Sequence, residues 1–169
     1  MWSWIKNRLW RKKPKLHRTH LPSNDFKTYM KMMVYDEKKL SKVCKNVGPD
    51  KGQVIGQILL QAAECFDKEH VMGCIGLAAN QLGFNARVFV AQDKPGRWKM
   101  YINPVVVGTD RKVKKTEHCL SYPDNKEGFG VMRSRKAVIK SDNNPTKSLT
   151  GIWAEVVQHE QDHLNGVLV

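Results

Sequence analysis

The sequence feature that most constrains this chain lies close to its C-terminal end. Residues 159–163 read His-Glu-Gln-Asp-His, so two histidines stand four positions apart with a glutamate directly after the first. On a helix these histidines share one face and can bind one metal ion, with Glu160 beside it to handle the protons of a water molecule. The apolar positions before the motif repeat with a helical period and run into it. The spacing therefore predicts a closing helix whose buried face carries His159, Glu160 and His163.

Two ordinary buried histidines are the alternative interpretation, and it suits a lone histidine better than this pair. A catalytic metal site needs a third protein ligand and an open fourth position. Residues 164–169 contain none of the usual ligands, so the third ligand is expected upstream. The candidates are Cys119, Cys74, His118 and His70. We favour Cys119, because Glu117 nearby could hydrogen-bond to a metal ligand. The alternative is that Cys119 is only a small buried hydrophobic residue.

Composition sets broad limits on the class of protein. A chain of 169 residues is most simply one domain, long enough for a hydrophobic core, and we expect a monomer. It contains no apolar run long enough to span a membrane. The four cysteines form no CxxC pair, and nothing resembles a secretory signal. These observations predict a reducing compartment with a thiol available as a ligand.

The formal net charge of +13 is concentrated near the N-terminus. Residues 1–24 hold seven Lys or Arg, three Trp and no acid. We interpret them as a basic arm that precedes a single domain over 25–169. Such an arm suits RNA or an anionic membrane surface. A cleaved organelle-targeting segment and a flexible solvated tail are the alternatives.

The order of expected elements predicts an α+β fold. An amphipathic helix is expected over 50–69, after an extended entry over 35–47. Strands are expected over 87–91, 98–107 and 131–141, with a polar connection over 109–115 and a turn over 142–146. This order indicates antiparallel sheets around a central C-terminal helix, with the earlier helix packed outside.

Three stretches follow one another along the chain: residues 74–81 read CIGLAANQ, residues 117–121 read EHCLS and residues 159–163 read HEQDH. Together they resemble the peptide deformylases, whose motifs GxGLAAxQ, EGCLS and HExDH occur in the same order. The resemblance extends over roughly residues 35–169, and it includes the strand at 87–90.

The resemblance implies a metal-dependent hydrolase that acts in protein biosynthesis. It would remove the formyl group from the N-terminal formylmethionine of nascent polypeptides and release formate. One divalent ion, Fe²⁺ favoured with Zn²⁺ or Ni²⁺ as alternatives, would be held by Cys119, His159 and His163. Glu160 would act as general base and then general acid.

The resemblance also implies how the substrate is bound. The Gln81 side-chain amide and the Leu120 backbone N–H would stabilise the oxyanion. The peptide would lie as an added strand, and an apolar pocket would take the methionine side chain. The implied substrate-binding residues are Ile75, Gly76, His118 and Arg133.

Three departures from the family pattern affect these expectations. Cys74 and His118 stand where glycine is usual, so we expect altered specificity or rate. The chain also stops six residues after His163, like the short forms carried by bacteriophages. We therefore expect the arm at 1–24 to contact the ribosome or RNA. The expected location is the bacterial cytoplasm, that of the host for a phage protein, with organelle import as the alternative.

Two other functions fit parts of the sequence. A zincin-like protease would use the same HEQDH motif, but its third ligand lies downstream, where this chain offers none. A basic nucleic-acid- or ribosome-binding protein would use the metal structurally. A closed structural site needs four protein ligands, with His118 or Cys74 as the fourth.

Overall fold

The structure is a computed structural model that describes residues 25–69 and 73–168. Its helices are α1 (Phe26–Met32), α2 (Glu37–Leu40), α3 (Pro49–Lys68) and α4 (Ile152–Leu164), with a short 3₁₀ helix, η1 (Ala79–Leu82). The strands of the first sheet are β1 (Gly76–Ala78), β2 (Val88–Lys94) and β3 (Arg97–Ile102). Those of the second are β4 (Val105–Gly108), β7 (Lys136–Ser141) and β8 (Asn144–Thr150). A two-stranded ribbon is formed by β5 (Lys112–Glu117) and β6 (Phe129–Ser134).

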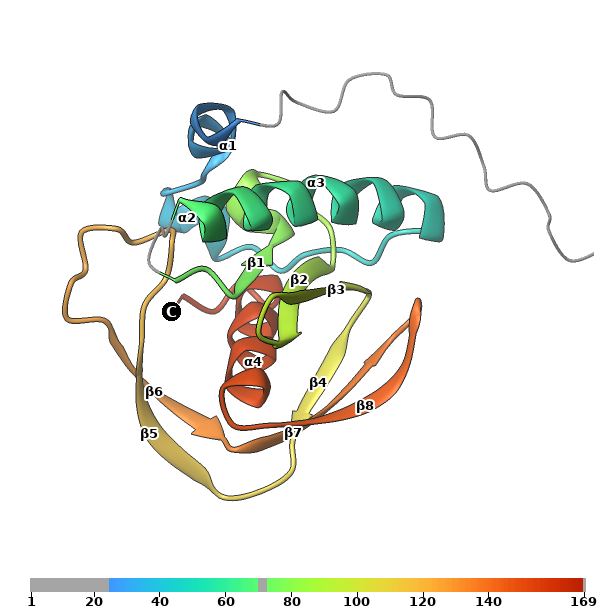
Figure 1. Ribbon diagram of the computed structural model, residues 1–169, viewed down its shortest axis with the longest axis vertical. Coiled ribbons are helices and arrows are strands. Elements are labelled where there is room, and N and C mark those ends of the chain that lie inside the picture. The colour runs from blue at the N-terminus through green and yellow to red at the C-terminus, as the bar shows by residue number, and fades with distance from the viewer. Residues whose placement is uncertain (1–24, 70–72, 169) are drawn as a thin grey trace, which may run out of the picture.

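Every strand pairing in the described part is antiparallel, which confirms the predicted α+β class. Helix α4 runs through the centre of the molecule, with the sheets arranged around it and α3 lying across the first sheet (Figure 1). The central C-terminal helix and the outer N-terminal helix are therefore both confirmed. None of the helices in the described ranges is both long and apolar enough to cross a bilayer.

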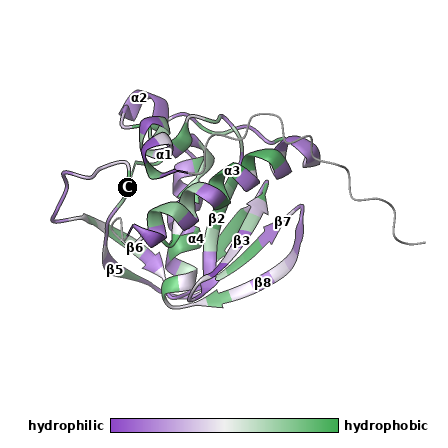
Figure 2. Ribbon diagram, turned by 45° about the horizontal axis from the view of Figure 1, so that its top comes forward, coloured by the Kyte–Doolittle hydropathy of each residue, from purple (hydrophilic) through white to green (hydrophobic). Residues whose placement is uncertain are grey.

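Strand β2 divides the core into two apolar clusters. Successive side chains of a strand point to opposite faces of the sheet. Val88 and Val90 accordingly pack in the cluster beneath α3, whereas Phe89 and Ala91 pack in the cluster around α4. In Figure 2, hydrophilic residues dominate the outer ribbon β5–β6, away from these clusters. Because β2 is buried on both faces, the first sheet is a rigid support for α4.

Helix α3 approaches the first sheet closely. A Cβ atom at Gly56 would lie 2.2 Å from Met100 Sδ, and one at Gly52 would lie 2.7 Å from Ile102 Cγ2. The predicted helix is confirmed, but its buried stripe includes Ile55, while Val54 is 42% exposed.

The expected strand over 98–107 is wrong, because the chain turns sharply within it. Asn103 has a φ of 49°, and its side-chain amide donates to Val47 O at 2.9 Å and to Asp142 Oδ2 at 2.6 Å. Strands β3 and β4 therefore belong to different sheets. The single strand expected over 131–141 is likewise two strands, β6 and β7, which meet at Arg135.

Several polar segments also form regular structure that the sequence did not indicate. The connection expected over 109–115 contains most of β5, and the turn expected over 142–146 already includes the start of β8. The extended entry over 35–47 contains α2, whose N-cap Asp36 accepts from Lys38 N at 2.9 Å. The proposed arm, residues 1–24, lies outside the described residues, and the domain boundary at 25 stays a prediction.

Candidate active site

Helix α4 brings the residues of the HEQDH motif to the centre of the fold. It begins after Gly151, and its buried positions include Val156, His159, Glu160 and His163. The apolar positions expected before the motif are Ile152, Trp153, Val156 and Val157. Val156 and Val157 are buried and Trp153 is partly buried, whereas Ile152 is 53% exposed. The motif therefore lies on the face of α4 that is turned away from solvent.

Cys119, in the segment after β5, meets the two histidines. Cys119 Sγ lies 3.2 Å from His163 Nε2, and the ligand atoms of Cys119, His159 and His163 all lie within 4.8 Å of one another. The three side chains are buried. Burial raises the pKa of the Cys119 thiol to about 12. The sulfur is therefore protonated near neutrality unless a cation is bound beside it.

A buried ionic network fixes the His159 ring. Glu117 Oε2 lies 2.9 Å from His159 Nδ1, and the same carboxylate accepts two hydrogen bonds from Arg133, at 2.9 and 2.8 Å. Arg133 Nη1 also donates to Asp162 Oδ2 at 2.5 Å. Burial alone would raise the pKa of Glu117, but these hydrogen bonds and charges lower it to about 2. The ionised carboxylate accepts from Nδ1, which leaves Nε2 of His159 for a ligand.

Glu160 stands beside this cluster, with one carboxylate oxygen that is buried and unbonded in the described part of the chain. It is 2% exposed, and its Oε2 forms no hydrogen bond with the described residues. Burial, followed by the charge of Glu117, raises the pKa of Glu160 well above its usual value. A Cβ atom at Gly76 would lie 2.3 Å from Glu160 Oε1, so β1 can pass this carboxylate only with glycine there.

Gln81 holds a fixed orientation on the other side of the cluster. Its Oε1 accepts from Ala78 N at 2.9 Å, and its Nε2 donates to Ser121 Oγ at 3.3 Å and to Cys119 Sγ at 3.5 Å. With the oxygen engaged by the backbone, the amide N–H groups face the cluster. The N–H that now points to Cys119 Sγ can donate to an oxygen atom held in the cluster when it changes partner.

These groups open into a cavity of about 250 Å³. One wall is formed by residues 73–76, the other by residues 116–120, and the floor by α4. The predicted residues Ile75, Gly76, Gln81, His118, Leu120 and Glu160 all line this cavity, as do two of the predicted ligands, Cys119 and His159. His163 lies deeper, 1% exposed.

Arg133 and the rival ligands occupy other positions. Arg133 does not line the cavity, because its guanidinium is held behind it by Glu117 and Asp162. Cys74 and His118 line the cavity but stand outside the ligand cluster found among the described residues. His118 is exposed, and its Nε2 lies 3.3 Å from Lys126 O. His70 lies outside the described residues.

Ile152 and Val156, expected only as part of the apolar stripe of α4, also line the cavity, and the sequence interpretation missed the acidic lining residue Glu155. Glu155 precedes His159 by four positions, so helical spacing places it on the same face, and that signal could have found it. Its carboxylate pairs with Lys115 Nζ at 2.9 Å. The pocket expected to be apolar therefore carries a carboxylate in its wall, and Lys115 holds that carboxylate from outside the lining.

The residues present fit a bound metal ion. One thiol and two imidazoles suit iron, nickel and zinc. Glu160 Oε2 is buried beside the cluster and finds no partner among the described residues. A buried polar atom of this kind normally has a partner, and solvent bound to an ion in the cluster would supply one here. Fold and site together define an α+β protein with a cluster that could hold a metal ion beside a buried glutamate, one of whose oxygens has no partner in the described part of the chain.

The comparisons with known proteins agree with this class. The family described as polypeptide deformylase matches residues 29–169, and the chain belongs to that family. The peptide deformylase of Neisseria gonorrhoeae is 31% identical over 145 residues, which cover 82% of this chain and 83% of that protein. The peptide deformylase of Pseudothermotoga lettingae is 36% identical over 110 residues, 62% of either chain, so this match spans less than two thirds of that relative.

Solved structures show the same likeness. The deformylase of the Vibrio parahaemolyticus bacteriophage VP16T, in complex with actinonin, matches with a TM-score of 0.66 and 30% identity, over 81% of this chain and 98% of that one. The enzyme from Thermotoga maritima matches with a TM-score of 0.68 and 29% identity, over 80% and 91%. The family resemblance inferred from three motifs is thereby confirmed.

Proposed function

We propose that this protein is a metal-dependent hydrolase that removes the formyl group from N-formylmethionyl peptides and releases formate. The observation that carries the proposal is the buried Cys119–His159–His163 cluster, which shares one cavity with the unpaired carboxylate of Glu160. Family membership supports the reaction class.

The cluster would hold one divalent ion through Cys119, His159 and His163. Fe²⁺ is favoured, and Zn²⁺ or Ni²⁺ suit the same sulfur and nitrogen donors. When bound, the ion supplies Lewis acidity that activates a water molecule and polarises the formyl carbonyl. Glu117 keeps the His159 ring in the ligand orientation, and Arg133 holds Glu117 in turn.

Glu160 would move the protons of the reaction. Its carboxylate takes a proton from the attacking water and later delivers it to the amine that leaves. Burial raises the pKa of Glu160, which makes it a stronger base than an exposed glutamate. Because Gly76 has no side chain, the backbone of β1 lies close to this carboxylate. A substrate paired with β1 would therefore also lie near Glu160.

The remaining cavity residues would bind and orient the substrate. Gln81 Nε2 and the Leu120 backbone N–H donate to the oxyanion. Strand β1 forms an edge of its sheet, so its outer backbone, around Ile75 and Gly76, can pair with an extended peptide, with His118 on the opposite wall.

This function places the protein where nascent chains carry formylmethionine, the bacterial cytoplasm. The relatives named above that are not phage proteins come from bacteria. A ribosome or RNA contact through residues 1–24 and a monomeric state complete the proposal.

Formate release tests the proposal. Protein purified without air is loaded separately with Fe²⁺, Ni²⁺ and Zn²⁺ and given formyl-Met-Ala-Ser, beside a Glu160→Ala control. Formate that requires both metal and Glu160 is the expected result. Bound metal without formate would favour a structural metal in a nucleic-acid-binding protein. Cleavage of the internal peptide bonds, seen by mass spectrometry, would favour the protease alternative.

A further inference from the structure

Two charged contacts join β5 to α4 like the rungs of a ladder, and three of their four residues line the cavity. Lys115 and Glu117 lie two positions apart on β5, and both side chains point toward α4. Their partners, Glu155 and His159, lie four positions apart on the helix. Two strand residues span about 6.7 Å and four helical residues about 6 Å, so two rungs of matched spacing form.

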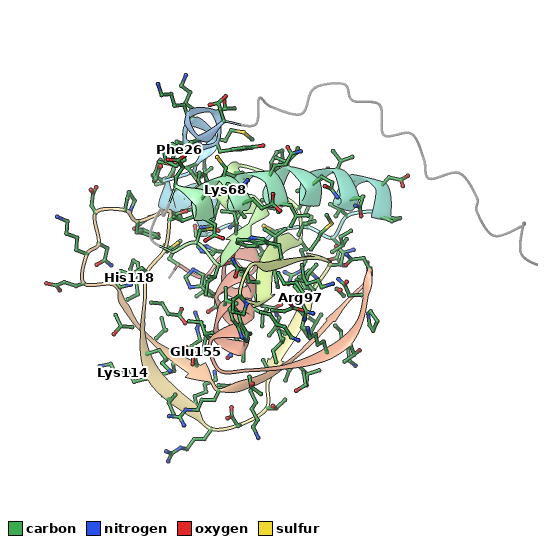
Figure 3. All side chains as sticks on the ribbon, in the orientation of Figure 1. Phe26, Lys68, Arg97, Lys114, His118 and Glu155 are labelled. Atoms are coloured by element: carbon green, nitrogen blue, oxygen red, sulfur yellow. The ribbon has the colours of Figure 1, made fainter. Side chains whose placement is uncertain are left out.

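The two rungs have different surroundings. The Glu117–His159 rung lies beside the ligand cluster, with Arg133 as a further partner. The Glu155–Lys115 rung lies one helical turn farther along α4, where Glu155 lines the cavity. The Glu155 side chain is 14% exposed, so its carboxylate is largely withdrawn from bulk solvent. In Figure 3, Glu155 lies between α4 and the ribbon, whereas the neighbouring Lys114 projects from the outer side of β5.

A substrate side chain can reach the second rung. In the proposed reaction the formyl carbon lies at the ligand cluster, beside His159. An unbranched side chain of four heavy atoms spans about 5 Å, which is comparable to the distance between the rungs. If the side chain of the first substrate residue runs along α4, its end therefore lies near Glu155 and Lys115.

We propose that Glu155, which lines the cavity and is held by Lys115, gives the substrate pocket a polar wall, so that first side chains of methionine length that end in a hydrogen-bonding group bind better than purely hydrocarbon ones. A glutamine side chain fits, because its carboxamide can donate to the Glu155 carboxylate. That carboxylate has a second oxygen besides the one that Lys115 contacts, so it keeps capacity for a ligand. The selectivity rests on the proposed hydrolysis of N-formyl peptides in the same cavity.

The test compares formyl-Gln-Ala-Ser with formyl-norleucyl-Ala-Ser, whose first side chains have similar length. The metal-loaded full chain is compared with a Lys115→Met/Glu155→Met variant, which keeps the apolar stems and removes both charges. The ratio of kcat/KM for glutamine over norleucine is expected to fall about tenfold or more, because an apolar wall cannot bond the carboxamide. A ratio unchanged within about twofold would overturn the proposal.

Two further variants separate the pair from general effects. Lys114→Met/Glu64→Met makes the same change in composition at exposed positions and should keep the wild-type ratio. Lys115→Glu/Glu155→Lys restores a pair with reversed polarity and should keep a preference for glutamine. Loss of the preference in the exposed control, or in the reversed pair, would count against a role for the Glu155–Lys115 contact.

A binding measurement keeps this test independent of turnover. Calorimetry with the unformylated peptides Gln-Ala-Ser and norleucyl-Ala-Ser should show tighter binding of the glutamine peptide to wild type, and that difference should disappear in Lys115→Met/Glu155→Met. Equal affinities in wild type would overturn the proposed selectivity. Absence of formate from every peptide, with the glutamine preference in binding retained, would contradict the proposed reaction alone.

Discussion

The two halves of α4 face the same cavity but differ in how they are built. The C-terminal half carries His159 and His163, which both lie close to Cys119. Glu117, on β5, holds the ring of His159. The N-terminal half carries Glu155, whose carboxylate pairs with Lys115 of β5. The first half belongs to a short pattern that sets the chemistry. The second lies outside any motif, and in the proposed reaction it would set the shape and polarity that a substrate side chain meets.

The largest expected effect breaks the catalytic half alone. Glu160→Gln keeps the shape of the side chain but removes its basicity. We expect formate release to fall by about 10³-fold, within the range for general acid–base catalysis, with metal content unchanged. Steady-state kinetics and metal analysis on the same preparation measure both quantities. Activity within tenfold of wild type would exclude Glu160 as the proton carrier.

Gly76→Ala should disturb both halves, because Gly76 contacts each. Its added Cβ would lie 2.3 Å from Glu160 Oε1 and 2.7 Å from Val156 Cγ2. We expect kcat/KM to fall on the order of 100-fold through displacement of the carboxylate. Gly130→Ala is the matched control, because its Cβ would meet only Lys114 Cε, at 3.5 Å. Equal kinetics for the two variants would show that β1 moves aside freely.

Glu117→Gln breaks the first rung and spares the second. The neutral amide holds the His159 ring less well, so we expect metal affinity to fall by about 10- to 100-fold. Competition with a chelator measures this change. The preference between glutamine and norleucine peptides should stay, provided that the ions are supplied in excess. If Glu117→Gln instead removes the preference for glutamine over norleucine and leaves metal affinity unchanged, then Glu117 serves selectivity and not metal binding. That result would contradict the account.

Asp93→Asn should leave both halves of α4 unchanged and affect stability only. Burial alone would raise the pKa of Asp93, but hydrogen bonds and charges from Arg97 and Lys147 lower it below its usual value. The ionised carboxylate therefore stabilises the fold above about pH 4, and this contribution is lost as the pH falls through the lowered pKa.

For Asp93→Asn we expect the free energy of unfolding at pH 7 to fall by about 1–3 kcal/mol. The difference from wild type should shrink below about pH 4. Urea unfolding at several pH values measures it, with formate release unchanged. A constant difference across that range would mean that the Asp93 charge is not its source.

Helical periodicity made α3 and α4 predictable, and the HEQDH motif placed the metal cluster on a buried face. Strand β5 could not be recognised, because its inward positions, Lys115 and Glu117, are charged residues that reach ion partners on a distant helix. Hydropathy treats such positions as solvent-exposed. The break at Asn103 depends on bonds to Val47 and Asp142, which only the folded chain brings together.

The site residues divide in the same way. The helical spacing of the HEQDH motif indicated Glu160, the need for an upstream ligand indicated Cys119, and the family resemblance supplied Gln81. Arg133 was expected to contact substrate, yet its partners Glu117 and Asp162 hold it behind the ligand cluster. Ionic networks across separate elements decide such placements, and a linear pattern does not record them.

X-ray absorption of the zinc-loaded protein tests the central claim most directly, because it counts the atoms bound to the metal. The account predicts one sulfur, from Cys119, two imidazole nitrogens, from His159 and His163, and one ligand from solvent. That set leaves the position that a hydrolytic site needs. Four protein ligands, with a second sulfur from Cys74 or a third imidazole from His118, would mean a closed structural site and would contradict the proposed hydrolase.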